Sequence, residues 1–109
     1  METAAFALDE IIEQQRVTGN SWIEFLNNSN LSMGVYNITA GTNDRESHDP
    51  HDRDEVYVGV KGRGRLTADG DVFEVAENSI IFVKAGVQHY FHDVIEDLTV
   101  LVFFAGTKQ

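Results

Sequence analysis

The chain has 109 residues, which is enough for one compact domain and too few for two of ordinary size. Its composition, 42% hydrophobic and 24% charged, is that of a globular protein and excludes a disordered or low-complexity chain. Eight Lys and Arg residues against 18 Asp and Glu residues give a formal net charge of −10, which repels nucleic-acid phosphates and anionic membrane surfaces. No apolar run approaches the roughly 20 residues of a membrane span, and the N-terminus lacks the basic start of a secretory signal. We therefore expect a soluble, cytoplasmic protein that binds neither nucleic acid nor membrane.

Only the N-terminal segment has a helical pattern. Apolar residues between Phe6 and Val17 fall roughly on one side, and charged residues fall on the other. Asp9 is the expected N-cap, and Gly19 ends the helix. We expect residues 1–20 to form a helical segment and residues 21–109 to form a β-barrel, the two making a single domain.

After Gly19 the chain consists of short runs rich in β-branched and aromatic residues, separated by turn-forming residues. Turns are expected at Lys61–Gly64 and at Asp69-Gly70, and the only long loop is Ala40–Asp54. About eight short strands at regular spacing predict a β-sandwich or barrel. The expected strands are Trp22–Leu26, Leu31–Thr39, Glu55–Val60, Gly64–Ala68, Val72–Val75, Ser79–Val83, His89–Val94 and Thr99–Ala105.

The absence of cysteine directs attention to the four histidines. Any metal in this chain must be held by His, Asp or Glu, and imidazole with carboxylate suits a borderline divalent ion. The long loop places His48 and His51 within eight positions of Glu55, which opens an apolar strand. His89 belongs to a later strand, and barrel folding brings such strands together.

These residues resemble the two motifs of the cupin family. The first motif has a glycine, two histidines, a glutamate and a second glycine, here Gly41, His48, His51, Glu55 and Gly62. The second motif is matched at Gly86 and His89, whereas its first glycine, its proline and its final asparagine are replaced by Asn78, Lys84 and Asp93. The resemblance spans about residues 31–105. The chain resembles a group of small single-domain cupins more closely than it resembles the family in general.

The resemblance implies an all-β fold, a double-stranded β-helix or jelly-roll barrel, with a short N-terminal helix. It also implies that His51, Glu55 and His89 are metal ligands, because they match ligand positions in both motifs. The fourth ligand is His48, which the group favours, or Asp49, which has the regular spacing of two residues before His51. The implied cofactor is one divalent transition metal: Fe, Mn, Ni, Zn or Cu.

Two functions follow from this resemblance. The first is a small-molecule metalloenzyme of oxygenase or isomerase type, and the second is a non-catalytic barrel that binds a small ligand with a structural or positioning metal. An acid or base other than the ligands would distinguish them, and Tyr57 and Asp93 are the candidates. His92 should face away from the barrel interior, as a surface or packing residue.

The likeness to cupins also implies a homodimer, and the apolar run Val100–Phe104 offers more apolar strand surface than one barrel interior needs. Aromatic residues on the expected strands should fill a core or a sheet interface. They are Tyr36, Tyr57, Phe73, Phe82, Phe91 and Phe103. The basic residues Arg53, Lys61, Arg63 and Arg65 are interleaved with glycines and acidic residues, which is typical of a solvated face.

Overall fold

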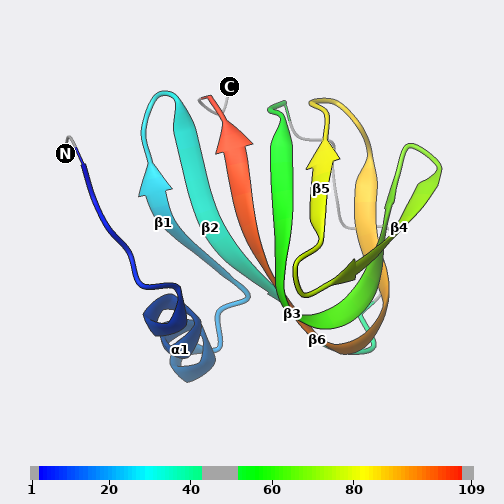
Figure 1. The fold of residues 1–109 in the computed structure, drawn as a ribbon, viewed down its shortest axis with the longest axis horizontal. Helices are drawn as coiled ribbons and strands as arrows, with labels where there is room; N and C mark the ends of the chain where they lie inside the picture. The colour runs from blue at the N-terminus through cyan, green and yellow to red at the C-terminus, as the bar shows by residue number, and fades with distance from the viewer. Residues whose placement is uncertain (1–2, 43–51, 107–109) are drawn as a thin grey trace.

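The computed structural model describes residues 3–42 and 52–106. In these two segments the chain forms one helix followed by six strands (Figure 1). They are α1 (Leu8–Thr18), β1 (Trp22–Asn27), β2 (Leu31–Ile38), β3 (Glu55–Ala68), β4 (Asp71–Ala76), β5 (Ile80–Val83) and β6 (His89–Ala105).

The N-cap of helix α1 lies two residues before its expected position. Ala7 is the N-cap, so the prediction of Asp9 is wrong, and Asp9 lies in the first turn, where a carboxylate interacts favourably with the helix dipole. The end of the helix is confirmed: Gly19 has φ +75°, and its N–H donates to the carbonyl of Gln15 over 2.9 Å. The buried Gln15 amide donates to the carbonyl of Val35, which ties α1 to β2.

All strand pairs are antiparallel, in the order β1-β2-β6-β3-β4, with β5 on β3. The two longest strands, β3 and β6, run side by side and curve together around one end of the molecule (Figure 1). β3 and β6 each cover two of the expected strands, so the described residues form six strands and not the predicted eight. The N-terminal half of β3 pairs with β5, and its C-terminal half pairs with β4.

The bend in this pair falls where a turn was predicted. Register shifts occur between Gly59 and Arg65, and Gly62 has φ +90°. A side chain at Gly62 would collide with the carbonyl of Asp97 on β6, so glycine is needed both for its conformation and for close approach of the two strands. The prediction of a turn at Lys61–Gly64 is therefore wrong: the chain remains a strand and bends.

The core lies on the inner side of the curved sheet. Along the end of β6, Val100, Val102 and Phe104 are buried, and the alternate residues Leu101 and Phe103 are only half-buried on the outer side. Tyr57 and Phe91 are core residues as predicted, whereas Phe73 and Phe82 are exposed in the single chain and do not fill its core.

This architecture is the predicted all-β jelly roll with a short N-terminal helix. Among the described residues, no helix has the length and apolar character needed to cross a membrane.

Candidate metal centre

Glu55 and His89 meet inside the barrel although they start different strands. Glu55 pairs with Phe104 at one end of the β3–β6 ladder, and His89 pairs with Ala68 at the other end. Because both strands bend together, the two ends face each other across the interior. His89 Nε2 lies 3.3 Å from Glu55 Oε2, and both side chains are 1% exposed. The structure thus brings together two of the four predicted ligands.

A tight turn before β6 positions the imidazole. The N–H of Val87 donates to the carbonyl of Lys84 over 3.1 Å, and Gly86 supplies the positive φ of +85° that this type of turn requires. The carbonyl of Val87 then accepts a hydrogen bond from His89 Nδ1 over 2.9 Å. Since a carbonyl only accepts, Nδ1 carries a proton, and in the neutral ring Nε2 is the nitrogen with a lone pair.

Tyr57 completes a buried cluster. Its hydroxyl donates to Glu55 Oε1 over 3.0 Å and lies 3.0 Å from His89 Nε2. Its ring packs edge-on against Phe91, with 5.3 Å between the ring centroids. Alternation along β3 explains why Glu55 and Tyr57 point to the same side of the sheet.

The surroundings of Glu55 disfavour its charged form. Burial raises the pKa of the Glu55 carboxyl to about 7, and this effect outweighs the hydrogen bond from Tyr57 and the positive charge of Arg53, which both lower that pKa. Burial, with the adjacent carboxylate, raises the pKa of Tyr57 well above its ordinary value, so the hydroxyl keeps its proton at neutral pH. Arg53 Cζ lies 4.4 Å from the centroid of the Phe104 ring, and the Arg53 guanidinium donates to the hydroxyl of Ser32.

The contacts within this cluster need one proton more than Tyr57 carries. The single hydroxyl proton satisfies either Glu55 or His89, and the remaining contacts require a further proton on the carboxyl or on the imidazole. A divalent cation in place of that proton would satisfy the carboxylate and the Nε2 lone pair together. The donor set, one buried carboxylate and one oriented imidazole, therefore fits a borderline transition metal.

The other predicted ligands, His48 with its alternative Asp49, and His51, lie outside the described residues. Within the described residues, no group of three or more His, Cys, Asp or Glu side chains could hold a metal ion. Glu55 and His89 are thus the described part of a predicted set of four.

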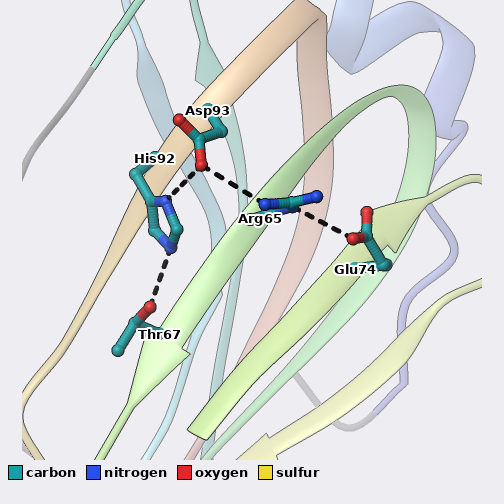
Figure 2. A network of polar contacts seen from close by, with 5 residues as sticks. All are labelled: Arg65, Thr67, Glu74, His92 and Asp93. Carbon is teal, nitrogen blue, oxygen red and sulfur yellow. Dashed lines mark hydrogen bonds and ion pairs between the residues drawn. The ribbon is translucent and has the colours of Figure 1, made fainter. Parts of the chain in front are cut away.

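Two further predictions concern the residues after His89. His92 lies on the outer side, as expected, but it is buried: Nε2 is 2.7 Å from the hydroxyl of Thr67 and Nδ1 is 3.0 Å from Asp93 (Figure 2). Asp93, a candidate acid or base, contacts neither Glu55 nor His89 among the described residues. Its φ of +49° interrupts the strand alternation, so its carboxylate is exposed and contacts His92 and Arg65 instead.

Arg53 is a residue near the site that its sequence pattern does not predict. Its spacing is that of a charged surface residue, but the structure places it half-buried against Phe104, near Glu55. A cation two residues before the carboxylate that opens a strand is the signal in the sequence that points to this role.

The fold and the site define a small jelly-roll barrel with a buried carboxylate–imidazole pair. The model of the cupin domain family matches residues 34–104, more than half of the chain, so this protein belongs to the cupin family. It is similar to the uncharacterized protein SCO3923 of Streptomyces coelicolor, with 43% identity over 105 residues that cover 96% of this chain and 98% of the relative.

Solved structures share the fold at low sequence identity. KdgF from a Halomonas species has a TM-score of 0.70 at 12% identity, over 81% of this chain and 79% of that one. The DMSP lyase DddQ from Ruegeria pomeroyi has a TM-score of 0.64 at 18% identity, over 72% of this chain but only 40% of that one. At these identities the likeness shows the jelly-roll architecture alone.

Proposed function

We propose that this cupin binds one divalent transition metal (Fe, Mn, Ni, Zn or Cu) in its barrel and acts on a small molecule there. The proposed ligands are His48, His51, Glu55 and His89. The observation that carries the proposal is the contact between Glu55 Oε2 and His89 Nε2, made by two side chains that are almost completely buried. A carboxylate in such a position costs free energy unless a proton or a cation compensates it.

The surrounding residues are arranged for ligation. The hydrogen bond from Nδ1 to the Val87 carbonyl fixes the ring and leaves Nε2 as the donor atom, which is the usual way a protein orients a metal-binding histidine. The hydroxyl of Tyr57 contacts both donor groups and keeps its proton, so it is placed to hold a proton beside a molecule at the metal.

A bound metal would supply Lewis-acid chemistry or, if redox-active, O₂ activation. Tyr57 would donate a hydrogen bond to the reacting molecule in either reaction, since its hydroxyl contacts both Glu55 and His89 and is not itself a proposed ligand. This arrangement supports a metalloenzyme of oxygenase or isomerase type. A DMSP lyase among the structures with this fold supports the view that the fold accommodates enzymes.

A non-catalytic barrel with a structural or positioning metal is the second candidate. It is favoured by the exposure of only 1% for both Glu55 and His89 and by the packing of Tyr57 on Phe91, which leave the described part of the site enclosed. An enclosed metal holds a fold or a ligand in place more readily than it turns over substrate.

The two candidates differ in O₂ consumption and turnover. The metal-free protein is reduced, loaded anaerobically with Fe(II) and exposed to O₂ with catechols, diketones or thiol acids. The oxygenase predicts O₂ uptake that requires one of these substrates and is lost in Glu55→Gln and slowed at least tenfold in Tyr57→Phe. An isomerase predicts substrate conversion without O₂ uptake. Metal-dependent binding of a panel member without turnover supports the non-catalytic barrel.

A further inference from the structure

A second site lies away from the Glu55–His89 pair. A pocket of about 750 Å³ opens beside the C-terminal half of β3, within the volume range of small-ligand sites. Its lining includes Thr42, Arg63, Arg65, Glu74, Asp93 and Ile95. Arg63 and Arg65 are exposed while the alternate residue Leu66 is buried, so the pocket is on the outer side of the sheet. Neither Glu55 nor His89 lines it.

A bulge in β6 forms one wall of this pocket. Arg63 pairs with Glu96 and Arg65 pairs with His92. Between these two pairs β6 advances by four residues while β3 advances by two, which is a bulge in β6. The extra residues include Asp93, with its φ of +49°, and Ile95, which is 67% exposed. The bulge thus places a carboxylate and an apolar side chain at the edge of the same pocket.

The acidic side of the pocket is held in place by a network of contacts (Figure 2). Arg65 Nε donates to Glu74 Oε1 over 3.0 Å, and its guanidinium lies 3.7 Å from Asp93 Oδ2. Asp93 Oδ2 also accepts from Nδ1 of the buried His92, whose Nε2 accepts from the hydroxyl of Thr67 over 2.7 Å. Two carboxylates therefore share one guanidinium, and this group carries a net charge of −1.

The basic side is Arg63. It lies two residues before Arg65, about 7 Å along the strand and on the same face. In the part of the chain that the structure describes, its guanidinium makes no hydrogen bond or ion pair. The pocket therefore offers a carboxylate pair at one place and an unshared cation at another, and the apolar side chain of Ile95 is part of its lining.

We propose that this pocket binds a free α-amino acid with an apolar side chain. The ammonium group would lie at Glu74 and Asp93, the carboxylate at Arg63, and the side chain against Ile95. A simple anion would gain Arg63 but meet two carboxylates in a protein of net charge −10. A simple cation would gain the carboxylates and meet two arginines. A zwitterion satisfies both sides of the pocket at once.

The test compares L-leucine with two analogues by calorimetry in the presence of EDTA, so that no metal at the barrel site binds the amino acid. N-acetyl-L-leucine lacks the ammonium charge, and L-leucinamide lacks the carboxylate. The proposal predicts that leucine binds at least tenfold more tightly than either analogue. Glu55→Gln should bind leucine like the wild type, because this site is separate from the proposed metal centre.

Two variants locate the ligand. Arg63→Gln should weaken leucine binding at least tenfold while leaving leucinamide binding unchanged. Arg16→Gln removes an exposed arginine of α1 that pairs with Glu13 in the same helix and does not line the pocket, so this variant should change neither affinity. The proposal is overturned if leucine does not bind at millimolar concentration, if all three compounds bind equally, or if the two arginine variants behave alike.

Discussion

The imidazole of His89 lies 3.3 Å from the carboxylate of Glu55, although the β3–β6 ladder holds these residues at its opposite ends. The bend shared by the two strands closes this distance. The site therefore depends on the whole barrel. The free energy of unfolding of the protein should change with the charge of Glu55 and with substitution of the glycine at the bend.

The first prediction concerns the pH dependence of the metal-free protein. The pKa of Glu55 is about 7 in the fold and near 4.5 in the unfolded chain, so the fold binds this proton more tightly. The stabilising effect is complete below pH 4.5 and is lost as the pH rises towards 7, with a total of up to about 3 kcal/mol. Urea unfolding in EDTA across this range should show that the difference between wild type and Glu55→Gln changes in this direction. A pH-independent difference would refute the assignment.

The second prediction concerns the bend. Gly62→Ala should lower the free energy of unfolding by about 3 kcal/mol, because the new methyl group meets the backbone of Asp97 in addition to the unfavourable φ. Gly70→Ala has a similar positive φ of +84° but open space around it, so about 1 kcal/mol is expected. Urea denaturation measures both. Equal losses would show that β3 and β6 do not approach closely at Gly62.

The strand pattern predicted the fold class and most element positions. It divided β3 and β6 into shorter strands, because Lys61–Gly64 has the composition of a turn and the alternation along β6 is broken at Asp93. Local sequence does not distinguish a chain reversal from a bend when the bend is stabilised by a neighbouring strand. Pairing of β3 with β6 determines that the chain bends and does not reverse.

The site was predictable where residue spacing determines it. Glu55 and His89 follow from two motifs, and the structure brings them together. The contact of Tyr57 with both residues depends on strand phase, and the residue pattern alone indicates no more than a candidate acid. Arg53 and the network around Asp93 were not predicted, because a half-buried arginine and a bulge arise from packing between distant strands.

The third prediction is that the protein is a homodimer. Ile80 and Phe82 of β5 are 74% and 61% exposed, and Phe82 lies beside Val56 on the outer face of the sheet, with Phe103 on the other side of Val56. We propose that a second copy covers this apolar face. Light scattering at micromolar concentration should give about twice the chain mass of 12.2 kDa.

A substitution in this face separates the dimer from other contacts. Phe82→Glu should yield a monomer, whereas Val72→Glu, at an exposed position on β4, should leave the mass unchanged. A monomeric wild type, or a dimer that tolerates Phe82→Glu, would contradict this face as the interface.

The fourth prediction decides between His48 and Asp49 as the fourth ligand. Loss of a coordinating group should weaken metal affinity more than tenfold. We expect this effect for His48→Ala and little change for Asp49→Ala, in competition titrations with a chelator of known affinity. The opposite result would assign the position to Asp49.

Elemental analysis determines whether the barrel holds a metal at Glu55 and His89. Protein expressed with Fe, Mn, Ni, Zn and Cu supplied and purified without chelator should carry close to one metal per chain. Glu55→Gln and His89→Gln should each lose most of it, and His92→Gln should retain it, because His92 is a buried histidine of the same strand that contacts Thr67 and Asp93 instead. A wild-type protein without metal, or a Glu55→Gln/His89→Gln double variant that retains it, would contradict the account.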